Sequence, residues 1–286
     1  MCQLFKSCEA RNAPCLAIIL SVMVVLFAAR GWGQGPELMN GGEMGVENLK
    51  RLLKNARDEL QVAKLPAKEI RLRLKIVESV ATVKSYFPHA DGGLPETRNA
   101  KYWTQDDDGC FIPRDKATEA IKDLWLTTSG IRCRKLSSIV MLKGLIDVAD
   151  AKRLAELDDM LRRKVIPNDL PDDGIGTLFE QPSPKHGETF QVGEFLAGDE
   201  IWFENPYFDR LNDELQSRCR GQEGHHVFYV GGGQVMDMYG REPIAIEAFR
   251  RSFLRWRSVK EVASKEGHEP TANEFQVKSV RRLILK

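Results

Sequence analysis

The chain has 286 residues, of which 42% are apolar and 29% are charged, and this is the composition of a globular protein with one sizeable core. Its 42 Lys and Arg residues nearly balance its 41 Asp and Glu residues. This balance gives no net field that would steer the protein toward nucleic acid or acidic substrates, and we expect no nucleic-acid partner.

Residues 1–33 are predicted to be a signal peptide or membrane anchor rather than part of the fold. Lys6 and Arg11 precede an apolar run, Cys15 to Ala29, which is short for a transmembrane span and has the length of a signal-peptide core. We therefore expect a secreted or periplasmic protein, with membrane anchoring through an uncleaved segment as the alternative. Residues 34–45 are predicted to be a glycine-rich linker.

Residues 46–88 are predicted to form a helical hairpin. Apolar residues recur at helical spacing from Val46 to Ala63 and again from Ala67 to Tyr86, and Pro66 separates the two segments. Such a hairpin either braces the core or forms a stalk for a partner.

The rest of the chain, residues 89–286, is predicted to form one α+β domain. After a loop-rich stretch, a helix is expected from Lys116 to Leu126, and a strongly apolar helix, dense enough to be central and buried, begins near Arg134. A Pro-, Gly- and Asp-rich loop follows from Asp169 to Val192. Three further elements complete the domain: a strand within Gly198 to Pro206, a helix from Pro243 to about Val262, and a final strand through Phe275 to Leu283.

Cys133 is the candidate nucleophile, because it opens the apolar helix. Unpaired N–H groups and the positive end of the helix dipole, together with Arg132 and Arg134, are expected to favour its thiolate. The simpler interpretation is a small buried apolar residue. A disulfide between Cys110 and Cys219 is one arrangement that leaves Cys133 as the free thiol of the mature chain.

A β-hairpin with three consecutive glycines at its turn is predicted from Gly224 to Gly240. If the first two glycines form the loop, His226 lies opposite Asp237, and the carboxylate can hold one imidazole nitrogen. A loop of all three glycines would instead place His225 on the same face as Asp237. The simpler interpretation is that both histidines are ordinary strand residues beside a binding loop.

A zinc site is a weaker candidate for the same region. Its ligands would be Cys219, Glu223, His225 and His226, but they lack a recognised ligand spacing. We therefore expect no metal and no cofactor.

With these elements in order, residues from about Ala100 to Arg251 resemble the small bacterial spore-coat protein-glutamine γ-glutamyltransferases, whose core is papain-like. The resemblance rests on Lys101, Tyr102, Trp103, Gly109, Phe111, Ala120, Ile121, Asp123, Cys133, Lys143, Leu145, Asp147 and the segment Gly198 to Pro206. It implies a central helix packed on an antiparallel sheet. Two features depart from the family: Arg132 stands where those enzymes have a glutamate, and the acid expected here follows the histidine instead of preceding it.

The resemblance implies a transglutaminase that acts on protein or peptide substrates bearing glutamine and lysine. Cys133 would attack a glutamine carboxamide, His226 would carry the proton, and Asp237 would orient the imidazole. The thioester would then pass to a lysine amine, forming a crosslink. Trp202 and Trp103 are candidate substrate-binding residues that would limit water, although core packing explains both equally well.

Two other functions fit the same residues. A cysteine amidase or peptidase would use the same triad with water as the acceptor. A catalytically degenerate binding or scaffolding module would keep only the fold, and Arg132 is the residue that favours this alternative.

Overall fold

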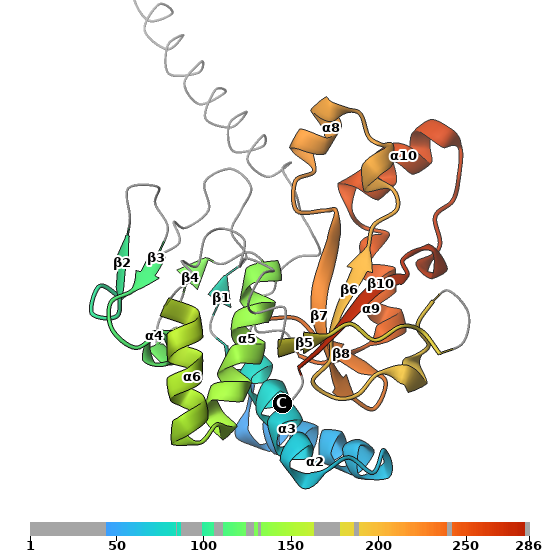
Figure 1. Cartoon of the computed structure of the whole chain (residues 1–286). Coiled ribbons are helices and arrows are strands. Elements are labelled where there is room, and N and C mark those ends of the chain that lie inside the picture. The colour runs from blue at the N-terminus through green and yellow to red at the C-terminus, as the bar shows by residue number, and fades with distance from the viewer. Residues whose placement is uncertain are drawn as a thin grey trace, which may run out of the picture.

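The structure is a computed structural model that describes residues 44–83, 85–86, 99–105, 111–123, 129–130, 133–162, 178–185, 189–238 and 242–283 (Figure 1). The predicted signal segment, residues 34–43 of the linker, Cys110 and Arg132 lie outside these residues. Secretion and membrane anchoring therefore stay predictions from the sequence. Within the described ranges, no helix has both the length and the apolar character needed to cross a membrane.

The helical hairpin and the central helix are confirmed. The hairpin consists of α2 (Val46–Val62) and α3 (Ala67–Thr82), and the central helix is α5 (Cys133–Val148). The other helical elements are α4 (Ala117–Asp123), α6 (Ala151–Arg162), α8 (Asp213–Arg218), α9 (Ile246–Phe253), α10 (Arg257–Glu266) and the 3-10 turns η2 (Val192–Glu194), η3 (Phe208–Arg210) and η4 (Ala272–Glu274). The single helix predicted from Pro243 to Val262 is wrong, because α9 ends at Phe253 and a new helix begins at Arg257.

The main sheet of the described residues is antiparallel and has the strand order β5-β10-β6-β7-β8-β9. Its strands are β5 (Phe179–Glu180), β6 (Glu200–Glu204), β7 (Gly224–Gly231), β8 (Gln234–Met236), β9 (Ile244–Ala245) and β10 (Val277–Leu283). Two short pairs lie apart from it: β1 (Ser85–Tyr86) with β4 (Ser129–Gly130), and β2 (Trp103–Gln105) with β3 (Phe111–Pro113). The final strand is thus confirmed, and it lies inside the sheet beside β6.

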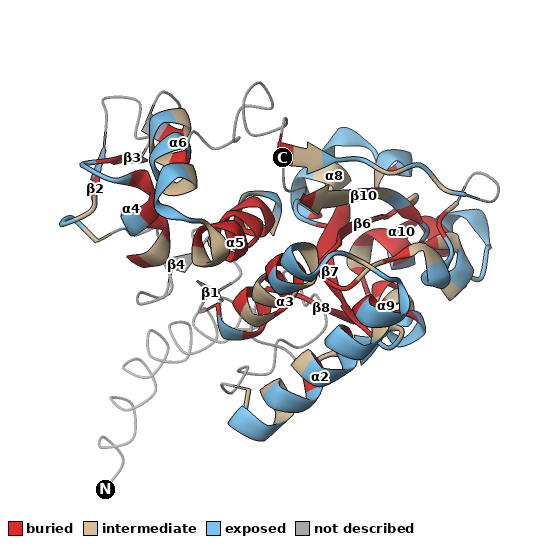
Figure 2. Ribbon diagram, turned by 60° about the horizontal axis from the view of Figure 1, so that its bottom comes forward, coloured by how far each residue is buried: buried red, intermediate tan, exposed pale blue. Residues whose placement is uncertain are grey.

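Strand β7 separates two cores, because its side chains alternate between the two faces of the sheet. Phe228 and Val230 pack with the core of α2, α3 and α5, whereas Val227 and Tyr229 pack with the aromatic core that α9 and α10 cover. Figure 2 shows this arrangement as buried residues on the sheet and on the inward faces of α3 and α5. The predicted α+β fold, with a central helix packed on an antiparallel sheet, is confirmed.

Helix α2 holds the glycine turn of the β7–β8 hairpin. The Glu59 carboxylate accepts hydrogen bonds from the Tyr229 hydroxyl at 3.0 Å and from the Gly232 N–H at 2.8 Å. Gly232 and Gly233 form the turn with φ values of 62° and 72°, which suit glycine. The helical hairpin therefore contacts the sheet as a brace.

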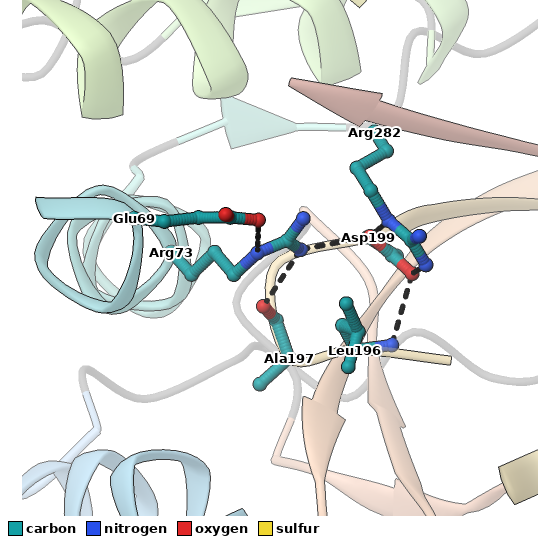
Figure 3. A network of polar contacts seen from close by, with 6 residues as sticks. All are labelled: Glu69, Arg73, Leu196, Ala197, Asp199 and Arg282. Carbon is teal, nitrogen blue, oxygen red and sulfur yellow. Dashed lines mark hydrogen bonds and ion pairs between the residues drawn. The ribbon is translucent and has the colours of Figure 1, made fainter. Parts of the chain in front are cut away.

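Asp199, just before β6, ties the other helix of the hairpin to the sheet. Arg73 of α3, only 1% exposed, donates to Asp199 Oδ1 at 2.9 Å, and Arg282 of β10 donates to both of its carboxylate oxygens (Figure 3). Glu69 also accepts from Arg73 at 3.0 Å. The opposite charges of Arg73 and Asp199 therefore pair where water does not reach them, whereas Glu69 is 29% exposed.

Helices α3 and α5 touch through a glycine. A Cβ atom added at Gly144 of α5 would lie 2.6 Å from Ile76 Cγ1 and 2.9 Å from the Ile76 backbone nitrogen. Real Cβ atoms do not approach other atoms this closely, so the absence of a side chain sets the spacing of the two helices. The same helix α5 begins at Cys133.

We expect Gly144→Ala to lower the free energy of unfolding by about 1–3 kcal/mol, the usual cost of overpacking a core. Urea unfolding followed by circular dichroism measures it. Gly193→Ala is the matched control, because a Cβ at Gly193 would have nothing within 4 Å. Equal unfolding midpoints for the two variants would contradict the close helix contact.

Candidate active site

Cys133 is the first residue of α5, half-buried at the end of the helix that faces the sheet. The main-chain N–H groups of His226 and Arg134 lie close enough to hydrogen-bond to its sulfur. Strand β7 and the first turn of α5 therefore meet at the thiol. Arg132, which the sequence placed beside it, lies outside the described residues.

The expected low pKa of the Cys133 thiol is wrong for the protein without substrate. Burial raises the pKa to about 11, and the hydrogen bonds from the His226 and Arg134 N–H groups offset only part of this effect. The carboxylates of Glu200 and Glu223 also oppose a second negative charge. The sequence shows the helix N-terminus, but it does not show how far the thiol is withdrawn from water.

His226 of β7 faces the helical side of the sheet, beside Cys133. Trp202 pairs with it across the β6–β7 ladder, and the two ring centroids are 4.3 Å apart. Trp202 is half-buried, so its indole forms a wall along the imidazole. Gly224 leaves room for this indole, because a Cβ there would lie 2.4 Å from the Trp202 ring.

The carboxylate that contacts His226 belongs to Glu200, the first residue of β6. Glu200 Oε1 pairs with His226 Nδ1 and accepts from the Ser137 hydroxyl at 3.0 Å, while Glu200 Oε2 pairs with Arg281 Nε. Burial alone would raise the pKa of Glu200, but the charges of Arg281 and His226 outweigh it and lower the pKa to about 2. Glu200 is therefore a fixed anion that holds one nitrogen of the imidazole.

The predicted pairing of Asp237 with His226 is wrong. The turn is Gly232–Gly233, not Gly231–Gly232, and the register shifts between Tyr229 and Gly231. Val235 consequently pairs with Tyr229, so Asp237 shares a face with His225. Its Oδ2 lies 4.0 Å from His225 Nε2. A shift of one residue in the pairing of two strands moves every side chain of one strand to the other face. The three glycines alone therefore do not determine which histidine shares a face with Asp237.

Trp103 lies elsewhere, in β2, where it is 2% exposed and belongs to the core of the helical side. Its carbonyl accepts from Arg114 Nε at 3.0 Å. The core-packing interpretation therefore fits Trp103, whereas Trp202 lies against the candidate histidine.

Cys219 is a free, fully buried thiol of the aromatic core, and Cys110, the other cysteine of the suggested bridge, lies outside the described residues. The described residues contain no group of three or more His, Cys, Asp or Glu side chains that could hold a metal ion. Cys219, Glu223, His225 and His226 are all described and form no such group.

Sequence reasoning missed Glu200, although one signal was available. A charged residue directly before Ile201, Trp202 and Phe203 is unusual in a strand that is buried on both sides. Such a carboxylate needs a partner, and this need marks it as a candidate site residue.

In the substrate-free protein, we expect Cys133 to react slowly with iodoacetamide at neutral pH and faster as the pH rises, with no plateau below pH ~10. The reason is the raised pKa of its thiol. Mass spectrometry of the labelled peptide measures the rate, and Cys219 serves as the internal control because it is fully buried. A plateau near pH 7 would show a thiolate at rest.

The sequence model of one family, described as protein-glutamine γ-glutamyltransferase, matches residues 59–238. Among solved structures, the chain is similar to a transglutaminase from Geobacillus stearothermophilus without its C-terminal extension, at 19% identity and a TM-score of 0.51. The match covers 76% of this chain and 91% of that one. No curated protein matches the sequence.

These findings confirm the resemblance and its α+β fold. The family model spans more than half of the chain, from within α2 to just after β8. Members of this family act on glutamine and lysine of protein substrates, as acyltransferases with a cysteine nucleophile. The chain belongs to the protein-glutamine γ-glutamyltransferase family.

Proposed function

We propose that the protein forms glutamyl-lysine crosslinks through a thioester on Cys133, with His226 as the base and Glu200 as the residue that orients it. The observation that carries this proposal is the meeting of three elements: α5 brings the thiol, β7 the imidazole, and β6 the carboxylate. Asp237 is not part of the proposed triad, because it lies beside His225.

The first step forms the thioester. His226 takes the proton of the Cys133 thiol as the sulfur attacks the carbon of a glutamine carboxamide. The C–N bond of the tetrahedral intermediate then breaks, and the imidazolium returns the proton to the leaving ammonia. Glu200 stabilises the imidazolium through Nδ1 during this step.

The second step transfers the acyl group. A lysine amine attacks the thioester carbonyl, His226 takes a proton from the amine, and the sulfur leaves and is protonated again. Because the pKa of the Cys133 thiol is raised, the sulfur returns to the protonated thiol once the acyl group has left. The products are an isopeptide bond and the free enzyme.

Trp202 is the proposed apolar wall that favours the amine over water. It lies on the His226 ring at 4.3 Å and is itself half-buried, so it occupies a face from which water would otherwise reach the imidazole. An amidase or peptidase would use the same three residues with water as the acceptor, which makes the acceptor the point to test.

We expect the protein to attach a fluorescent primary amine to a glutamine-bearing protein, and Cys133→Ala to abolish this, because the thioester needs the sulfur. Gel fluorescence measures incorporation and an ammonia assay measures total turnover. Ammonia release without incorporation would show an amidase. Incorporation that survives in Cys133→Ala would overturn the mechanism, and absence of both activities over a wide substrate panel would favour the scaffolding module.

We expect Glu200→Gln to lower kcat by about 10²–10⁴-fold, because an amide cannot stabilise the imidazolium. Asp237→Asn is the matched control, since it neutralises a buried carboxylate beside the other histidine. We expect that variant to keep kcat within about 3-fold of the wild type. A larger loss in Asp237→Asn than in Glu200→Gln would return the orienting role to Asp237.

A further inference from the structure

Arg281 of β10 is the cation that contacts the proposed orienting carboxylate. It is the direct cross-strand partner of Glu200, and its Nε pairs with Glu200 Oε2. Its Nη1 and Nη2 donate to the hydroxyls of Ser138 and Ser137 at 3.2 and 2.9 Å. The Phe179 ring of β5 lies 5.3 Å from the guanidinium carbon. Three elements therefore fix the orientation of this side chain.

We propose that Arg281 is a positioning residue of the reaction: it fixes Glu200 in the orientation and in the ionised form that hold His226 toward Cys133. This inference rests on the proposed function and adds to it a residue 148 positions after the nucleophile, beyond the matched family region of residues 59–238. Arg281 hydrogen-bonds to Glu200, Ser137 and Ser138, and we infer that it acts on His226 through Glu200.

The groups around Glu200 show why a cation is needed there. Glu200 is 1% exposed and faces Arg281 from β10, His226 from β7 and Ser137 from α5. While the imidazole of His226 is neutral, Arg281 is the one of these three side chains that carries a positive charge. Without it, a buried carboxylate takes up a proton at a higher pH, because burial disfavours the charged form. A protonated Glu200 could not stabilise the imidazolium.

Arg281 also balances the charge during the first step. Glu200 by itself opposes formation of the Cys133 thiolate. The guanidinium cancels that charge, so the site is neutral overall with the thiol and the imidazole, and it stays neutral when the proton has moved from sulfur to nitrogen. A thiolate forms more easily beside this ion pair than beside an unpaired carboxylate, because the guanidinium weakens the field of Glu200 at the sulfur.

Arg282 is the matched control for Arg281. It is the next residue on the same strand, and it makes a similar buried ion pair, but with Asp199 instead of Glu200 (Figure 3). Asp199 has a second cation, Arg73, at 2.9 Å, and no contact with His226 is described for it. Loss of Arg282 therefore weakens the link between β10 and β6 without removing the cation of Glu200.

The first measurement is the pH dependence of amine incorporation in Arg281→Gln and Arg282→Gln. We expect kcat of Arg281→Gln to fall about 10-fold or more at pH 7, and further toward pH 5, with KM changed less than about 3-fold. For Arg282→Gln we expect the pH profile of the wild type. Equal profiles for the two variants, in either direction, would overturn the assignment.

The second measurement reads Glu200 directly and does not depend on activity. In ¹³C spectra of Glu-labelled protein, with the Glu200 signal assigned by its absence in Glu200→Gln, we expect an ionised carboxylate at pH 4 in the wild type and in Arg282→Gln. We expect a protonated one in Arg281→Gln. Should the wild type incorporate no amine, the proposed function fails, while this titration still tests the ion pair. A Glu200 that stays ionised at pH 4 in Arg281→Gln would overturn the inference.

If Arg281→Gln does not fold, the more conservative variants Arg281→Lys and Arg282→Lys test the same inference. Lysine keeps the charge but cannot contact a carboxylate and two hydroxyls with one planar group. We therefore expect a lower kcat in Arg281→Lys than in Arg282→Lys, with Glu200 ionised in both. Equal kcat values in these two variants would contradict the positioning role.

Discussion

A carboxylate that water does not reach is the constraint on which the candidate site depends. An unpaired charge in that position costs several kcal/mol, so a fold that keeps Glu200 ionised must bring cations and hydroxyls to it. The sheet order meets this need: β6 lies between β10 and β7, and α5 crosses the same face. One strand brings Arg281, the other brings His226, and the helix brings Ser137. The thiol is placed by the same helix, one turn earlier, so the residues that satisfy the buried charge are also those that surround Cys133.

The adjacent residue extends this constraint to the helical hairpin. Asp199 is as deeply buried as Glu200, and it is balanced by Arg73 of α3 and Arg282 of β10. Helix α3 in turn packs against α5 at Gly144, and α2 holds the glycine turn through Glu59. The hairpin therefore contacts the site's strands and its helix at once. It acts as part of the scaffold that sets the distance between α5 and the sheet, which a stalk for a partner would not do.

The sequence predicts the parts of this structure that local patterns encode. Helical periodicity gives α2, α3 and α5 with small errors at their ends, and it places Cys133 at the first turn of the central helix. The site needs non-local information. His226 and Glu200 are 26 positions apart and meet only because β6 and β7 pair, and Arg281 joins them from a strand that comes last in the chain. The predicted pairing of Asp237 with His226 was wrong for a related reason. Three glycines allow more than one loop, and a shift of one residue puts His225 instead of His226 on the face of Asp237.

The corrected acid also changes how the chain compares with its family. Pairing His226 with Asp237 puts the histidine before the acid, which reverses the order of the spore-coat enzymes and leaves the triad in doubt. With Glu200 as the partner, the acid lies on the first of two adjacent antiparallel strands and the histidine on the second, and the reversal disappears. The difference that stays is Arg132, a base in place of an acid beside the nucleophile. A site that already contains a fixed Glu200 anion does not need a second carboxylate to orient its imidazole, and a second one would further oppose ionisation of a thiol whose pKa is already raised. In the proposed function, the exchange of an acid for Arg132 therefore leaves the proposed triad of Cys133, His226 and Glu200 complete.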